Sequence, residues 1–350
     1  MMAESPNPTT IEPLRYAVER VKSGHCLSVE EMAGAWRVLM SGNAPDGLVG
    51  ALLATLATRN PTGEELSGAS SIMREFVHSV ELGGDHTQFL DTCGTGGAPK
   101  TFNVSTAAAI VLAASGVKIA KHGNRSRTGR GSAEVLACLG INIHASEKQQ
   151  QASFESENIC FCFAPNHHKS VASVMPVRKL LGFPTIFNLL GPLSNPCGAG
   201  RQLLGVWDDC FMVPMAQSLL RSGTTKSAVV HSSDGLDEVS VSAPTRMVLV
   251  ANGKLVESMI DPEALGLSIS KRSDLVASDL EEATVFVRDA VTGVLSGGVR
   301  DMVVINVALG LFLADRVQDL SEGVLLAKET IDSGRANETL LNWAKISYST

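Results

Sequence analysis

The spacing of apolar residues changes near residue 84, and this change limits the folds open to the chain. Residues 11–82 show helical periodicity only. From Phe89 onward, short apolar runs alternate with helical segments, a pattern typical of parallel strands joined by crossover helices. We therefore expect an α/β protein with a small N-terminal all-helical domain, residues 1–83, and a larger α/β domain, residues 84–350, built on a mostly parallel central sheet.

Helix and strand signals locate the individual elements. Ser28 with Glu31, and Thr62 with Glu65, form capping-box patterns that start two helices of the first domain. The segment 170–181 is helical between two strand candidates, so we expect an excursion at about 168–184 that packs near the N-terminal domain. The expected strands lie at residues 117–120, 142–143, 159–163, 185–188, 203–206, 228–231, 247–250 and 255–259.

Composition argues against several classes of protein. The formal charge is −7 and the basic residues are dispersed, so we expect no nucleic-acid partner and no anionic membrane partner. The longest mainly apolar run, residues 303–314, is shorter than the roughly twenty residues of a spanning helix, and residues 1–10 lack a secretory signal pattern. Seven scattered cysteines, including Cys160 and Cys162 in a strand-like run, favour buried thiols in a reducing, cytoplasmic setting over a disulfide framework or a metal clip.

A glycine loop followed by a helix is the first candidate binding element. The run GTGG at residues 94–97 lets the backbone approach a ligand closely. Asn103, Ser105 and Thr106 stand just before an apolar helix, whose free N–H groups would face the same ligand. This arrangement indicates an anion site, although the same pattern also occurs in turns that only connect a strand to a helix.

The run KHGNRS at residues 121–126 is the second candidate. It follows an expected strand and places two cations, Lys121 and Arg125, beside the hydrogen-bonding side chain of Asn124. Such a turn suits a phosphorylated or carboxylated ligand, and Ser132 begins another helix whose N-terminus adds backbone donors. A solvated basic turn is the alternative.

Two further stretches supply opposite charges. In DGLDE, residues 234–238, Asp237 and Glu238 are adjacent, and a loop that holds two carboxylates together often does so around a divalent cation such as Mg²⁺. Ser105 could contribute a hydroxyl to that ion. A solvated acidic turn is the alternative. Arg178, on the helix of the excursion, could pair with a ligand carboxylate, although a surface arginine is the commoner case.

Six motifs in order resemble the anthranilate phosphoribosyltransferase family of tryptophan biosynthesis. They are GTGG (94–97), NVST (103–106), KHGNR (121–125), PVRKLLG (176–182), TIFNLLGPLSNP (185–196) and DGLDE (234–238). The resemblance implies a helical domain hinged to an α/β domain, in the arrangement shared with nucleoside phosphorylases, and a homodimer formed through the helical parts. It also implies the reaction of anthranilate with phosphoribosyl pyrophosphate, with Mg²⁺, to give N-(5-phosphoribosyl)anthranilate and pyrophosphate.

The same resemblance assigns roles to residues. Lys121, Asn124 and Arg178 are expected to be catalytic. Ser105, Asp237 and Glu238 are expected to hold Mg²⁺, and Gly94, Asn124, His168 and Arg178 to bind anthranilate. The expected contacts of phosphoribosyl pyrophosphate are Gly94, Thr95, Gly96, Gly97, Asn103, Val104, Ser105, Thr106, Lys121, His122, Gly123 and Ser132.

Two departures from the family pattern keep other functions in view. Ala98-Pro99 follows GTGG where the family commonly has an acidic residue, and the loop between Arg125 and Ser132 is about one residue short. The alternatives are a pyrimidine nucleoside phosphorylase-like enzyme and a non-catalytic member of the same fold that binds polyanions. The motifs DGLDE (234–238) and NLLGPLSNP (188–196) favour the transferase.

Overall fold

The computed structural model describes residues 8–99, 101–126 and 128–349. Outside this part lie residues 1–7, where no secretory signal was expected, and Arg127, in the loop expected to be about one residue short. The N-terminal region is built of helices α1 (Pro8–Lys22), α2 (Val29–Met40), α3 (Asp46–Ala57) and α4 (Gly63–Glu75). Both expected capping boxes are confirmed: Ser28 accepts from the Glu31 N–H, and Thr62 from the Glu65 N–H.

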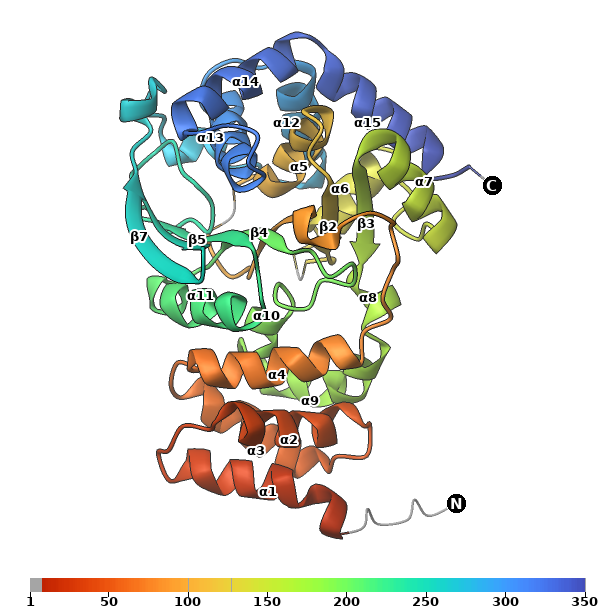
Figure 1. Ribbon diagram of the computed structural model, residues 1–350, viewed down its shortest axis with the longest axis vertical. Coiled ribbons are helices and arrows are strands. Elements are labelled where there is room, and N and C mark those ends of the chain that lie inside the picture. The colour runs from red at the N-terminus through yellow and green to blue at the C-terminus, as the bar shows by residue number, and fades with distance from the viewer. Residues whose placement is uncertain (1–7, 100, 127, 350) are drawn as a thin grey trace.

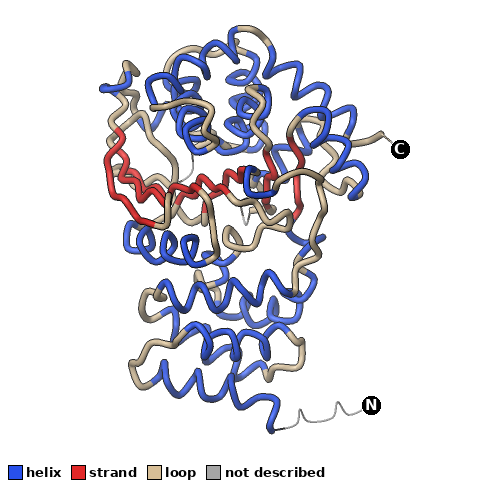
Figure 2. Tube along the Cα trace, in the orientation of Figure 1, coloured by secondary structure: helices blue, strands red, loops and turns tan. Residues whose placement is uncertain are grey.

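A seven-stranded sheet forms the centre of the α/β domain (Figure 2). Its strands are β1 (Leu90–Gly94), β2 (Ile119–Gly123), β3 (Ile159–Phe163), β4 (Arg201–Gly205), β5 (Lys226–Ser232), β6 (Thr245–Ala251) and β7 (Lys254–Ile260). The order is β3-β2-β1-β4-β5-β6-β7. The first five strands in this order are mutually parallel, β6 is antiparallel to β5, and β7 is antiparallel to β6. The expected mostly parallel sheet is thus confirmed.

Helices cover both faces of the sheet (Figure 1). On one face lie α5 (Val104–Ala114), α6 (Ser132–Cys138), α12 (Leu280–Thr292), α13 (Gly298–Leu313), α14 (Leu320–Asp332) and α15 (Arg335–Ile346). Helix α7 (Glu147–Glu157) flanks the edge strand β3, where its Phe154 packs with Cys160 and Cys162. Toward the helical domain lie α8 (Ala164–His167), α9 (Met175–Leu181), α10 (Phe187–Leu190) and α11 (Met212–Arg221). Successive residues of β5 face opposite sides of the sheet, as the two-residue period of a strand requires. Ala228 and Val230 pack into the core that contains α5 and α13, and Val229 packs into the core that contains α11 and the N-terminal helices. Short 3₁₀ turns are η1 (His86–Gln88), η2 (Lys169–Val174), η3 (Asp209–Phe211), η4 (Glu263–Leu265) and η5 (Arg272–Leu275).

Two expected strands are wrong. Residues 142–143 form a turn because the Asn142 backbone N–H and side-chain amide both donate to Ser347, beyond α15. Residues 185–188 enter helix α10, and the Asn188 side chain accepts from the Thr185 N–H at its start. Both were short apolar runs, for which periodicity alone cannot separate a strand from a buried helix.

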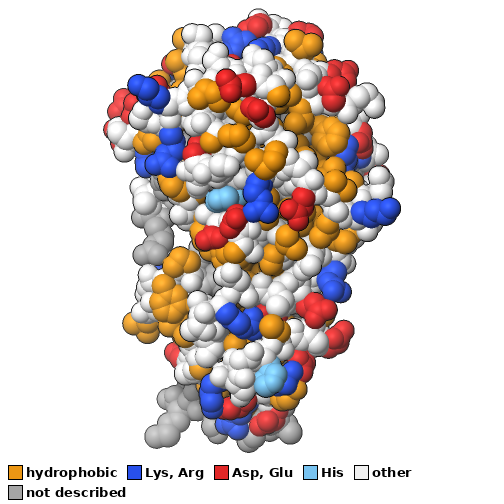
Figure 3. All heavy atoms as spheres, turned by 90° about the vertical axis from the view of Figure 1, so that its left-hand side faces the viewer, with side chains coloured by type: hydrophobic (Ala, Val, Ile, Leu, Met, Phe, Trp, Pro, Cys, Tyr) orange, Lys and Arg blue, Asp and Glu red, His pale blue; other side chains and the backbone are white. Residues whose placement is uncertain are grey.

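The excursion joins the helical region. In the described residues η2 packs on α2 and α9 on α3. Just beyond the excursion, the ring of Phe187 in α10 lies 5.0 Å from that of Trp36 in α2. The chain after α4 runs up past α8 to the sheet (Figure 1). Within the described residues, no helix combines the length and apolar character needed to cross a membrane. One face of the molecule shows acidic and basic side chains interspersed (Figure 3).

Candidate functional site

The carboxyl ends of the parallel strands bring the candidate motifs to one edge of the sheet. β1 ends at Gly94, β2 at Gly123, β4 at Gly205 and β5 at Ser232, so the loops that follow these strands are neighbours. This is the edge at which parallel α/β sheets bind ligands.

The GTGG loop is held in shape by its neighbours. Thr95 donates from its backbone N–H to the Gly205 carbonyl (2.9 Å), and its hydroxyl accepts from the Trp207 N–H (3.3 Å). Gly97 has a φ of +101°, and a Cβ there would lie 3.3 Å from the Trp207 ring. A side chain at Gly97 would therefore be strained and crowded, which explains the glycine.

The two carboxylates of DGLDE meet the glycine loop. A Cβ on Gly94 would lie 2.5 Å from Asp237 Oδ2, and the Gly96 N–H hydrogen-bonds to the Asp237 carboxylate. Glu238 accepts from the Thr101 hydroxyl at 3.0 Å. Segments about 140 residues apart in sequence thus form one surface, with acidic groups directly beside the loop.

The electrostatics of this pair suit a cation. Both residues are half-buried. Desolvation raises the pKa of Asp237; desolvation and then the Asp237 charge raise the pKa of Glu238 well above its ordinary value. Two crowded carboxylates with raised pKa values match the oxygen ligands that Mg²⁺ prefers, so these residues fit that ion.

Lys121 lies beneath the same loop. Its side chain is 1% exposed and its ammonium donates to the Thr92 carbonyl (2.6 Å), with Ser105 carbonyl and hydroxyl oxygens at 3.4 and 3.5 Å. Burial lowers the pKa of Lys121, opposed by the charges of Asp91 and other acidic neighbours. Its ammonium therefore acts from below, through Ser105, rather than projecting into solvent.

The sequence interpretation missed Asp91. This fully buried carboxylate in β1 accepts from the His122 N–H (3.1 Å) and the Asn195 amide (2.9 Å). Burial raises its pKa to about 6, and the Lys121 charge opposes that rise. A charged residue inside an apolar strand, three positions before the glycine loop, was the available signal.

The N-terminus of α5 faces this edge without a side-chain cap. Asn103 stands at the N-cap position, but its amide donates to the Arg130 carbonyl instead. Val104 is the first helical residue and is fully buried, so it can offer a ligand only its backbone. The Thr106 hydroxyl is buried and has no hydrogen-bond partner in the part of the chain that the structure describes.

The turn after β2 divides the KHGNR residues between two settings. Gly123 approaches Ser132 so closely that a Cβ would lie 2.3 Å from the Ser132 hydroxyl, and Asn124 is exposed beside them. The His122 side chain instead lies beside His168, with ring centroids 5.1 Å apart. Among the described residues, the buried Nε2 of each ring has no hydrogen-bond partner. Burial is the main cause of the lowered pKa of each histidine, which is about 4 for His168.

Arg178 has its own setting on α9. Its guanidinium lies 4.6 Å from the Phe187 ring centroid and donates to the Met175 sulfur, and burial lowers its pKa. Among the described residues, no hydrogen bond or ion pair links Arg178 to Lys121 or Asn124. A partly buried cation without a carboxylate partner remains able to receive one.

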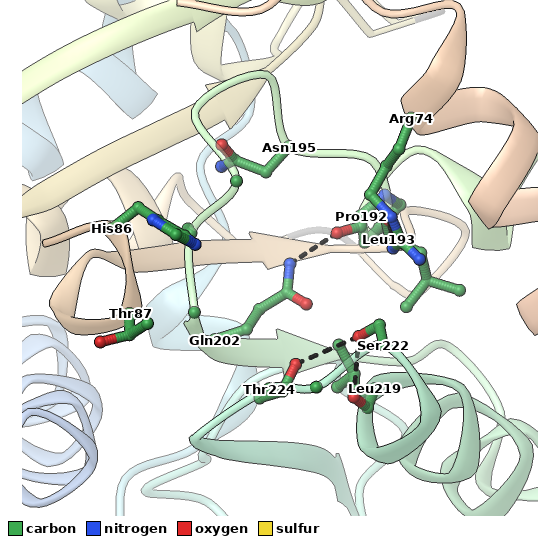
Figure 4. A pocket seen from close by; sticks show the side chains of 14 residues that line it. Arg74, His86, Thr87, Pro192, Leu193, Asn195, Gln202, Leu219, Ser222 and Thr224 are labelled. Atoms are coloured by element: carbon green, nitrogen blue, oxygen red, sulfur yellow. Dashed lines mark hydrogen bonds between the residues drawn. The ribbon is translucent and has the colours of Figure 1, made fainter. Parts of the chain in front are cut away.

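A cavity of about 120 Å³ lies at the opposite edge of the sheet, near the amino ends of β4 and β5 (Figure 4). Arg74, His86, Gln202 and Thr224 line it, and the Gln202 amide donates to the Pro192 carbonyl across it. It is therefore separate from the loops described above.

Comparison with known proteins agrees with this site. Residues 86–337 match the glycosyl transferase family, a/b domain, and residues 15–77 match its helical bundle domain. The anthranilate phosphoribosyltransferase of Thermoanaerobacter sp. (strain X514) is 40% identical over 93% of this chain and 96% of its own length. That of Hyphomonas neptunium is 43% identical over 93% and 95%.

Solved structures give the same answer. The anthranilate phosphoribosyltransferase of Thermus thermophilus superposes with a TM-score of 0.89 at 34% identity, covering 95% of this chain and 99% of that one. The Saccharomyces cerevisiae enzyme, solved in complex with PRPP and Mg, gives 0.86 at 25% identity over 97% and 99%. These matches favour the transferase over the phosphorylase and non-catalytic alternatives, and the chain belongs to the anthranilate phosphoribosyltransferase family.

Proposed function

We propose that this protein transfers the 5-phosphoribosyl group of phosphoribosyl pyrophosphate to the amine of anthranilate, giving N-(5-phosphoribosyl)anthranilate and pyrophosphate in tryptophan biosynthesis. The contact of the Gly94–Gly97 loop with Asp237 is the observation that carries the proposal. It sets a phosphate-type loop directly against a cation-binding carboxylate, which is what a pyrophosphate ester with a bound metal requires.

The chain's own residues stabilise the charge that develops. As the bond from ribose C1 to the pyrophosphate oxygen lengthens, negative charge grows on the pyrophosphate. The backbone N–H groups of residues 94–97 and of the α5 N-terminus, with Asn103, Ser105 and Thr106, bind its oxygens, and Lys121 supports Ser105 from below. Gly123 and Ser132 border the other phosphate. Mg²⁺, held by Asp237 and Glu238 with Ser105, would supply neutralising charge to the leaving group.

Anthranilate needs positioning more than activation, because its amine is already a nucleophile. Arg178 binds the carboxylate, and Asn124 with His168 borders the amine and ring. The lowered pKa of His168 keeps that imidazole neutral near pH 7. The neutral ring can accept a hydrogen bond from the amine and adds no charge that would repel Arg178. The His122 ring packs beside His168, and its backbone N–H donates to Asp91, so His122 would support the site from behind these residues.

We further propose a cytoplasmic homodimer formed through the helical region. Leu180 and Phe183, at and beyond the end of α9, are 88% and 41% exposed, and an interface would cover them. Sedimentation or light scattering of the purified protein gives the mass directly.

The decisive test is fluorescence of product formation from anthranilate and phosphoribosyl pyrophosphate, with and without Mg²⁺. We expect turnover that depends on Mg²⁺. No turnover at any magnesium concentration, in protein shown to be folded, would refute the proposal.

A further inference from the structure

Three buried cysteines meet on the face of the sheet that is turned toward the helical domain. Cys160 and Cys162 point the same way from β3, and Cys197 comes from the loop before β4. Their sulfur atoms all lie within 4.8 Å of one another, with Cys162 and Cys197 3.4 Å apart. All three are free thiols. The spacing of Cys160 and Cys162 alone gave no such site, because the third sulfur is supplied from 35 residues further along the chain.

His167, in the same region of the fold, has an unpartnered ring nitrogen among the described residues. His167, on α8, is 3% exposed, and its Nδ1 lies 2.9 Å from the His78 carbonyl. A carbonyl can only accept, so Nδ1 carries the proton and Nε2 of the neutral ring bears a free lone pair. That Nε2 is buried and has no hydrogen-bond partner among the described residues, and the segment from His78 to Val80 joins His167 to Pro196, next to Cys197.

We propose that Cys160, Cys162 and Cys197, whose three sulfur atoms already lie within 4.8 Å of one another, bind one soft divalent ion of the zinc class, and that the side chain of His167 turns to bring Nε2 in as the fourth ligand. A tetrahedral zinc ion with Zn–S bonds of about 2.3 Å holds its sulfurs roughly 3.8 Å apart, a spacing that the present cluster brackets. Three thiols and one imidazole form a closed structural set, and the His78 carbonyl already fixes the tautomer that zinc needs. Binding releases three thiol protons to solvent.

The ion would fasten the link between the two parts of the molecule. The chain leaving the helical region is bonded on both sides of the cluster: His78 N–H donates to the His167 carbonyl, and Val80 N–H to the Pro196 carbonyl. Val80 and Leu82 also cover the thiols. This site is separate from the Mg²⁺ residues and uses ligands that Mg²⁺ avoids.

The test is titration of the chelator-treated full-length protein with Co²⁺ and then Zn²⁺. We expect one equivalent of Co²⁺ to give the near-ultraviolet sulfur-to-cobalt absorption of a thiolate site, with proton release, and Zn²⁺ to displace it and raise the melting temperature. Cys162→Ser and Cys197→Ala, one from the sheet and one from the loop, should each lose the absorption. The exposed Cys138→Ser is the matched control and should keep it.

Absence of a saturable one-equivalent absorption in the wild-type protein would overturn the proposal, whether or not the variants fold. An unchanged absorption in a folded Cys162→Ser variant would do the same, because the metal would then be bound elsewhere.

Discussion

The two edges of the sheet treat charge in opposite ways. At the amino edge, Arg201 and Lys226 begin β4 and β5, and Asp315 lies between them, at 2.7 and 2.8 Å. Both cations also donate to main-chain carbonyls at the end of α13. At the carboxyl edge, Asp237 and Glu238 stand side by side, and desolvation raises the pKa of each.

Both edges carry charged side chains, but at the amino edge opposite charges are paired with one another. Charges that satisfy one another hold β4 and β5 to α13 and leave little to offer a ligand. Like charges placed together cost stability and persist where something else binds them. We therefore expect substitutions at the carboxyl edge to change activity, and substitutions at the amino edge to change stability only.

The largest effect is expected when both carboxylates are neutralised. Asp237→Asn with Glu238→Gln should lower kcat/KM by at least about a hundredfold, because the leaving pyrophosphate loses its metal site. The same change should raise the free energy of unfolding by about 1 kcal/mol, since it removes like-charge repulsion and desolvation. Kinetics at several Mg²⁺ concentrations and urea denaturation measure both. Asp261→Asn, at an exposed turn, is the control. Full activity in the double variant would remove the metal assignment.

Arg178 tests whether an unpaired cation marks the acceptor side. Arg178→Ala should raise the KM for anthranilate roughly ten- to a hundredfold, the value of a charge-assisted hydrogen bond, and change the KM for phosphoribosyl pyrophosphate much less. The neighbouring exposed Lys179→Ala should change neither. A larger effect on phosphoribosyl pyrophosphate would show that Arg178 belongs to the donor side.

The sequence predicted the parts of this site that depend on local pattern. GTGG, DGLDE and the capping boxes carry their chemistry in adjacent residues, so their positions followed once the β/α alternation was recognised. The sheet itself was predictable because each parallel strand is a short apolar run of its own.

What could not be predicted depends on partners distant in the chain. Asp91 is held by Asn195, and Lys121, expected to contact phosphoribosyl pyrophosphate, is almost fully buried. Residues 185–188 became helical because their apolar side chains pack against the helical domain, as the Trp36 contact with Phe187 shows. The residues adjacent in sequence do not indicate which distant residues these side chains will contact.

His168 gives a pH test of a buried, uncharged group at the carboxyl edge. Burial, followed by the charge of His167, lowers the pKa of His168 from 6.5 to about 4, so the unfolded chain takes up a proton that the folded chain refuses. The stability that this provides is complete above about pH 6.5 and is lost as the pH falls toward 4. In His168→Gln, the fall in the free energy of unfolding between pH 7 and pH 4 should be smaller by about 1 to 2 kcal/mol, a figure reduced for the partial exposure of the ring. Urea denaturation from about pH 7 to pH 4 measures it, and parallel curves for both proteins would contradict it.

The smallest effect is expected at the amino edge. Asp315 has a φ of +55°, so alanine there would add backbone strain, whereas asparagine tolerates this conformation and removes only the charge. Asp315→Asn should cost about 1 kcal/mol, because the carboxylate is 57% exposed and its two cations keep their carbonyl acceptors. The loss should shrink in high salt, and kcat and both KM values should stay unchanged. A fall in activity at equal stability would mean that this edge also serves the reaction, and the contrast between brace and binding site would fail.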